Sequence, residues 1–113
     1  MTIDDFNDVT FEIFGTDYTI KVVDSLDNDE RKDEALYGDF SSSKKLIRIS
    51  KNVQDTAQSE SELYRTLLHE VVHAIFDTGQ YNSCFSDEPL VEWISRCIYS
   101  LLKQNIISKD YAR

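Results

Sequence analysis

Two histidines and a glutamate form a His-Glu-x-x-His pattern at positions 69–73. Residues four apart on a helix project from the same face, one turn above the other, so His69 and His73 could direct two imidazole nitrogens at one tetrahedral zinc ion. Glu70 follows the first histidine directly and would lie beside that metal, where it could take a proton from a zinc-bound water. The residue types and their spacing therefore predict a Zn²⁺ site with a glutamate as general base.

This short pattern also arises by chance on solvated helices of unrelated proteins. Two features argue against that interpretation here. The chain has only two histidines, and both lie in the pattern. The flanking residues, Leu67 and Leu68 before it and Ala-Ile-Phe at 74–76 after it, leave almost no polar face for solvent. Ionisable groups in apolar surroundings are costly unless they are paired or bind a metal, so we expect His69 and His73 to be zinc ligands.

Two segments around the pattern carry a resemblance to a known family. Residues 66–76, Thr-Leu-Leu-His-Glu-Val-Val-His-Ala-Ile-Phe, and residues 88–95, Glu-Pro-Leu-Val-Glu-Trp-Ile-Ser, resemble compact metallopeptidase-like proteins of bacteriophages and mobile elements, similar to the ImmA/IrrE group of gluzincin-type peptidases. Upstream, Tyr-Gly at 37–38 and Leu-Ile-Arg-Ile at 46–49 resemble the strand pair before the active helix of that group. The resemblance implies a phage protein that hydrolyses peptide bonds with zinc, a peptide or protein substrate, and a minimal zincin-like fold.

A zinc site needs a further protein ligand, and the sequence has no third histidine. In gluzincins this ligand is a glutamate on the following helix, which implies Glu88 as the ligand and Glu92 as the acid that hydrogen-bonds a ligand histidine. Glu92, one turn inside its helix, nevertheless matches the height of His73 better. We favour Glu88 and leave Glu92 open as the alternative third ligand, with Cys84 and Asp77 as weaker candidates.

Transition-state stabilisation usually requires a hydrogen-bond donor aimed at the developing oxyanion. Tyr99 falls on the same side of the last expected helix as the two glutamates, and Tyr81 falls in the loop before it, so these tyrosines are the candidate donors. We expect no arginine or histidine to compete for the role. An extended substrate would add to an exposed edge of the sheet, for which we consider residues 45–50.

Alternation of apolar and polar residues with a period of two predicts the strands. One hairpin is expected from strands at 9–14 and 18–23, with turn residues between them, and a second from strands at 36–40 and 46–50. Residues 25–35 are polar and charged and fit either a short exposed helix or a loop. The two hairpins would form a small, mostly antiparallel sheet.

Helix signals fill the rest of the chain. Ser59 and Glu62 fit a capping box, and the apolar residues that follow at steps of three and four predict a helix buried on most sides. We expect it to end near Gly79 in a left-handed conformation, followed by a loop over 80–87 and a last helix over about 88–105. The predicted fold is α+β, with the sheet packed on the active-site helix and a second C-terminal helix.

Length, composition and charge limit the size of the fold and the kinds of partner that we expect. The 113 residues, 41% of them hydrophobic, suffice for one domain over 1–113 with a modest core. A formal charge of −9 argues against nucleic acid as a partner, and no apolar segment approaches the roughly 20 residues that span a bilayer. The sequence begins without a secretory signal, so we expect a cytoplasmic protein, in the host cell if phage-encoded, with Cys84 and Cys97 reduced.

The sequence leaves a second function open. The zinc site could be structural or vestigial in a binding or regulatory module that acts on a host protein without catalysis. The acidic residues concentrated over 4–39 allow one version of this module, a nucleic-acid mimic that occupies a basic groove. Cleavage specificity and oligomeric state are not fixed by the sequence.

Overall fold

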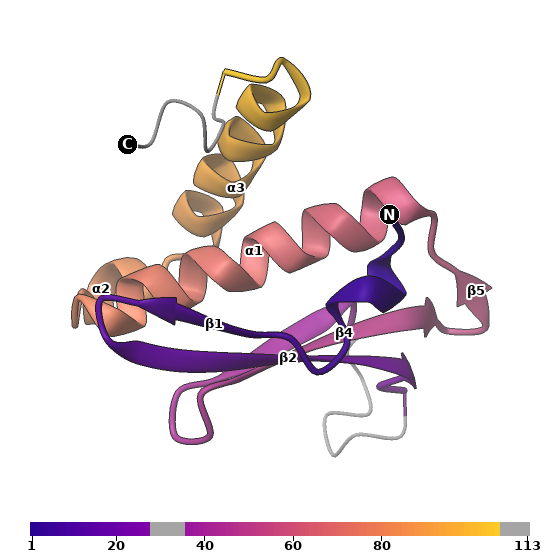
Figure 1. Ribbon diagram of the computed structural model, residues 1–113, viewed down its shortest axis with the longest axis horizontal. Coiled ribbons are helices and arrows are strands. Elements are labelled where there is room, and N and C mark those ends of the chain that lie inside the picture. The colour runs from indigo at the N-terminus through magenta and orange to yellow at the C-terminus, as the bar shows by residue number, and fades with distance from the viewer. Residues whose placement is uncertain (28–35, 107–113) are drawn as a thin grey trace.

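A β-sheet covered by one long helix forms the body of the protein, as Figure 1 shows for the computed structural model, which describes residues 1–27 and 36–106. Helix α1 (Glu60–Thr78) lies across one face of the sheet, and helix α3 (Glu88–Lys103) leans against α1 on the side away from the sheet. The remaining elements are the 3₁₀ helix η1 (Ile3–Phe6), strands β1 (Thr10–Ile13), β2 (Thr16–Ser25), β3 (Gly38–Ser41), β4 (Leu46–Val53) and β5 (Thr56–Ala57), and helix α2 (Asn82–Phe85). The α+β class predicted from the sequence is confirmed.

The sheet has the strand order β1-β2-β4-β3, with β5 paired to β4. Both predicted hairpins are present, because β1 pairs with β2 and β3 with β4 in antiparallel registers. A parallel pairing of β2 with β4, in which Ile20 lies opposite Ile47, joins the two hairpins. Because β4 is hydrogen-bonded on both sides, residues 45–50 do not form the exposed edge that we expected from the sequence, and β3 forms that edge instead.

The core lies between the sheet and α1. Ile47 and Ile49 are two apart on β4 and therefore point to the same face, where both are fully buried. They pack with Ile20 of β2 and with Leu63 and Leu67 of α1. Full burial of such a side chain contributes about 1.5–3 kcal/mol, so this cluster holds α1 in place on the sheet.

The two ends of α1 differ in how well the sequence predicted them. The capping box is confirmed, since Ser59 Oγ accepts a hydrogen bond of 3.2 Å from the backbone N–H of Glu62. The prediction that Gly79 adopts a left-handed conformation is wrong. Gly79 has a φ of −83°, and it is the next residue, Gln80, that has a positive φ, of 60°. A Cβ at Gly79 would lie 2.7 Å from the Tyr81 ring, so glycine serves close packing here rather than the turn conformation.

The segment after α1 holds more structure than we expected. The predicted loop over 80–87 contains the short helix α2, and η1 and β5 were also not predicted. Asp87 caps α3 by accepting a hydrogen bond of 3.1 Å from Leu90 N–H, and α3 ends at Lys103, close to the predicted end. Residues 28–35 of the predicted polar segment lie outside the described residues. None of the described helices is long and apolar enough to cross a membrane.

Candidate metal centre

His69 and His73 lie one turn apart on the face of α1 that is turned towards α3. Their rings are 5.1 Å apart between centroids, and their side chains are only 18% and 8% exposed. Leu63, Leu67 and Val72 occupy the buried positions of the same helix, so packing of the apolar residues determines where the histidines point. The helix and the pairing of the two histidines are as the sequence predicted.

Glu88, in the first turn of α3, lies against both histidines. One carboxylate oxygen, Oε2, is 2.9 Å from Nε2 of His69, and the other, Oε1, is 3.0 Å from Nε2 of His73. The donor atoms of the three residues all lie within 4.8 Å of one another, and this is the one such His, Cys, Asp or Glu cluster of metal-ligand geometry among residues 1–27 and 36–106. The structure therefore brings together the two histidines and the glutamate that we favoured.

Glu92 lies one turn further along α3, on the other side of the His69 ring. Its Oε2 is 2.7 Å from Nδ1 of His69. A carboxylate at this position accepts a hydrogen bond from Nδ1–H, which keeps the proton on Nδ1 and leaves Nε2 with a free lone pair, the tautomer that a metal ligand needs. Helix α2 brings the start of α3 back to the height of His73, and this is why Glu88 rather than Glu92 reaches both rings.

The second histidine lacks such a carboxylate. Nδ1 of His73 is buried and makes no hydrogen bond of good geometry within the described part of the chain. The Phe85 ring packs 5.1 Å from the His73 ring, and the Phe85 backbone lies close enough to favour the protonated imidazole. A neutral His73 that binds a metal through Nε2 carries its proton on Nδ1, so this nitrogen would turn its N–H towards α2.

The two histidines differ in their affinity for a proton. Burial lowers the pKa of His73, and the opposing attraction of Glu88 does not overcome it. Burial also disfavours protonation of His69, but the carboxylates of Glu70, Glu92 and Glu88 outweigh this effect and raise its pKa. The carboxylates therefore favour a proton on His69, whereas burial disfavours one on His73.

The donor set fits zinc. Ligand atoms about 2.0–2.1 Å from a tetrahedral zinc ion are roughly 3.4 Å apart. The contacts of 2.9 and 3.0 Å from Glu88 would open by a few tenths of an ångström, and any pair of donor atoms near the 4.8 Å limit of the cluster would close by roughly 1.4 Å. Two imidazoles and one carboxylate are also the ligand types of catalytic zinc sites, which keep a fourth position for water or substrate.

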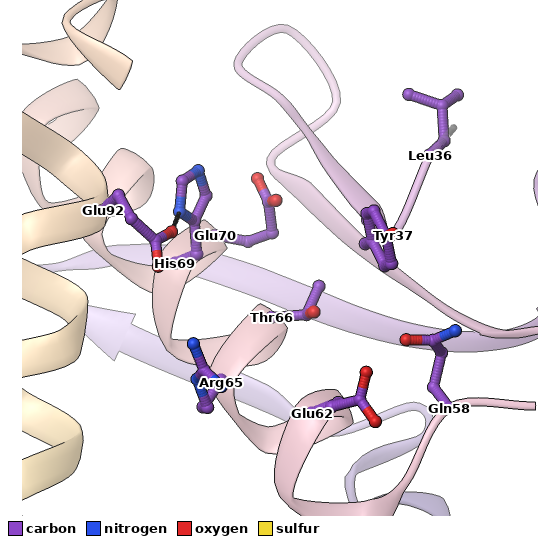
Figure 2. A pocket seen from close by; sticks show the side chains of 10 residues that line it. Leu36, Tyr37, Gln58, Glu62, Arg65, Thr66, His69, Glu70 and Glu92 are labelled. Carbon is purple, nitrogen blue, oxygen red and sulfur yellow. Dashed lines mark hydrogen bonds and ion pairs between the residues drawn. The ribbon is translucent and has the colours of Figure 1, made fainter. Parts of the chain in front are cut away.

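A cavity of about 450 Å³ adjoins His69, whereas His73 and Glu88 are not among the residues that line it. Figure 2 shows α1 as its floor, Tyr37 on one side and Glu92 of α3 on the other. Glu70 is 6% exposed, and its carboxylate projects into the cavity next to the His69 ring. A Cβ at Gly38 would lie 2.8 Å from Thr66 Cγ2 and 3.5 Å from Glu70 Oε2, so a glycine is what lets β3 approach α1 at this point.

Sequence reasoning missed one charged residue of the cavity. Arg65 lines it, although we expected no arginine to compete with the tyrosines as the oxyanion donor. Arg65 stands four residues before His69, so it belongs to the same face of α1, and the spacing alone could have revealed it. Thr66, four residues before Glu70, also lines the cavity and had the same spacing signal, whereas Tyr37 lies outside the helix and had none.

The structure does not bring the other candidate residues into the cavity. Tyr99 packs against Tyr64 at 6.1 Å between ring centroids and lines a second, smaller cavity near the start of α1. Tyr81 is 63% exposed beside Phe76, and Cys84 is half-buried on α2.

Asp77 connects the end of α1 to the sheet through hydrogen bonds. It accepts hydrogen bonds from Tyr18 at 3.0 Å, from Lys45 at 2.8 Å and from Ser42. Burial opposes ionisation of this carboxyl group, but the hydrogen bonds from Lys45, Ser42 and Tyr18 outweigh it and lower the pKa of Asp77. Asp77 is thus a helix-end residue rather than part of the metal site.

Comparisons of the chain with protein families, with curated proteins and with solved structures find no match. The resemblance to the ImmA/IrrE group therefore stays a prediction. The argument for a function rests on the geometry around His69 and His73.

Proposed function

We propose that this protein is a zinc-dependent metallopeptidase. The main support is the convergence of His69, His73 and Glu88 within 4.8 Å, with His69 and the neighbouring Glu70 both lining an open cavity. Structural zinc sites are usually closed by four protein ligands, whereas three protein ligands next to a cavity are typical of catalytic ones. The arrangement thus favours a catalytic centre over a structural or vestigial zinc site.

Each residue has a role in peptide hydrolysis. The chemistry that zinc supplies in such a site is the activation of water and the polarisation of the peptide carbonyl. Glu70 accepts the proton of the water as its oxygen attacks the carbonyl carbon, and passes that proton to the amine as the C–N bond breaks. Glu92 orients His69 through Nδ1, so that Nε2 stays directed at the metal.

An extended peptide fits along β3. This strand is at the edge of the sheet, and Tyr37 and Gly38 at its start line the cavity that holds Glu70. A peptide that adds to the edge would gain main-chain hydrogen bonds and lie directly over the His69 face of α1. Tyr37, half exposed at the cavity, is a better placed donor for the oxyanion than Tyr99.

The test replaces Glu70 with glutamine, with Glu12→Gln on β1 as the matched control. Zinc content is measured by mass spectrometry of the purified protein, and cleavage is measured on a proteome-derived peptide library. We expect Glu70→Gln to keep its zinc and to lose about 10²- to 10⁴-fold in cleavage rate, the usual contribution of a general base. Equal cleavage by this variant would refute the proposal, and so would a wild-type protein that binds zinc and cleaves no peptide.

Two expectations accompany this proposal. We place the protein in the cytoplasm, and we name a peptide or protein, rather than a nucleic acid, as its substrate. The charge of −9 supports the second point, because a nucleic acid would be repelled from most of the surface.

A further inference from the structure

Arg65 is the only Lys or Arg among the described residues that line the cavity. It makes no ion pair or hydrogen bond within residues 1–27 and 36–106, although Glu62 and Glu92 line the same cavity. Glu92 is engaged with Nδ1 of His69, and Glu62 accepts a hydrogen bond of 2.8 Å from Ser59 Oγ in the helix cap. The guanidinium of Arg65 is therefore free to take a carboxylate from a bound molecule.

Helix geometry sets the distance between Arg65 and the metal centre. Four residues advance about 6 Å along a helix, and Figure 2 shows Arg65 on the turn before His69, on the side of α3. An extended peptide advances about 3.3 Å per residue, so 6 Å corresponds to about two residues. A group one or two residues from the cleaved bond would lie at Arg65.

The direction of the bound peptide follows from β3. Gly38 lies beside Thr66, and Ser42, just after β3, hydrogen-bonds Asp77 near the end of α1, so β3 and α1 run the same way. Antiparallel pairing is the slightly more stable mode of strand addition, and a peptide antiparallel to β3 runs opposite to α1. Its residues after the cleaved bond then lie towards the start of α1, where Arg65 is.

We propose that Arg65 determines specificity by binding a carboxylate on the C-terminal side of the cleaved bond, at the first or second residue after it. The planar guanidinium matches a carboxylate with two parallel hydrogen bonds. The carboxylate is the free C-terminus of the substrate or an Asp or Glu side chain. This inference rests on the proposed metallopeptidase function.

The test uses inhibitors whose register is fixed by the metal. Each carries a hydroxamate, which binds zinc, followed on its C-terminal side by two amino-acid residues. The two members of the first pair differ only at the C-terminus, which is a free carboxylate in one and a carboxamide in the other. In the second pair both C-termini are amidated, and the last residue is Glu in one inhibitor and Gln in the other. A third pair has Glu or Gln on the N-terminal side of the hydroxamate. Affinities are measured by calorimetry on zinc-loaded wild type, Arg65→Ala, Arg65→Lys and the control Arg96→Ala, which alters an exposed arginine of α3 outside the cavity.

We expect the wild type and Arg96→Ala to bind an inhibitor with a C-terminal-side carboxylate about 10- to 100-fold tighter than its uncharged partner, the usual effect of hydrogen bonds to a charged group. In Arg65→Ala the ratio should fall to about one, and Arg65→Lys should restore part of it. The first and second pairs tell a free terminus from an acidic side chain. Three results would overturn this inference and leave the proposed function standing: an unchanged affinity ratio in Arg65→Ala, no preference for a carboxylate in the wild type, or a preference for a carboxylate on the N-terminal side. A protein that binds no zinc would overturn the proposed function as well.

Discussion

Replacing Glu88 with alanine removes the carboxylate that lies against Nε2 of both histidines. The same change at Glu92 leaves those contacts in place and removes the acceptor of Nδ1 of His69. The two variants therefore separate a direct metal ligand from a residue that orients one. We expect Glu88→Ala to lose far more zinc affinity than Glu92→Ala.

The size of each effect follows from these contacts. Loss of a carboxylate that orients a ligand histidine typically reduces metal affinity by 10- to 100-fold, or about 1.4–2.7 kcal/mol, and this is the expectation for Glu92→Ala. Glu88→Ala leaves only two protein ligands and leaves both Nε2 atoms without their carboxylate. Its affinity should fall by more than about 100-fold.

Competition with a chromophoric zinc chelator near neutral pH measures these affinities, and circular dichroism of the zinc-free proteins checks that the variants fold. Glu12→Ala, an exposed change on β1, is the control and should match the wild type. A larger loss in Glu92→Ala than in Glu88→Ala would show that the roles are reversed. Wild-type affinity in both variants would refute the carboxylate-containing site.

Three further outcomes are expected. Gly38→Ala places a Cβ 2.8 Å from both Arg48 O and Thr66 Cγ2, so it should cost about 1–3 kcal/mol in urea unfolding, and an unchanged stability would contradict the close approach of β3 to α1. Because the pKa of Asp77 is lower in the folded state than its usual value near 3.9, its carboxylate stabilises the fold above that pH, and this stabilisation is lost as the pH falls through the folded pKa. Asp77→Asn should therefore be about 1–3 kcal/mol less stable near neutral pH and lose less stability than the wild type on acidification below about pH 5; parallel profiles would contradict this. Zinc at about 100 times its dissociation constant should raise the unfolding free energy by about 2.7 kcal/mol in thermal melts of the wild type and not of His73→Ala, with reversal by a chelator, and equal melts would argue against zinc at these histidines.

Local signals in the sequence were sufficient for most elements of the fold. Ser59 and Glu62 predicted the start of α1 because a capping box depends only on residues three apart. The alternating strands predicted both hairpins for the same reason. The parallel pairing of β2 with β4 had no local signal, because it joins residues such as Ile20 and Ile47 through their shared packing against α1.

The candidate site likewise has a part that local sequence signals predicted and a part that depends on tertiary structure. His69, Glu70 and His73 follow from spacing on one helix, whereas the choice between Glu88 and Glu92 depends on how the chain returns to α1. Helix α2 decides it, and α2 was predicted as a loop. Tyr99 illustrates the converse error, because it shares a face of α3 with Glu92 but lies about two turns further on, against Tyr64.

The metal centre would also strengthen the attachment of α3 to α1. Along α3 only Val91 and Ser95 are fully buried, and most of its other apolar side chains are partly exposed. Glu88 and Glu92 supply the polar contacts that complete the attachment, and all of them are made to His69 and His73. A zinc ion bound there would replace hydrogen bonds between partly exposed groups with stronger metal–ligand bonds. Loss of the metal should therefore loosen α3 and the wall of the cavity that Glu92 forms, which would couple substrate binding to metal occupancy.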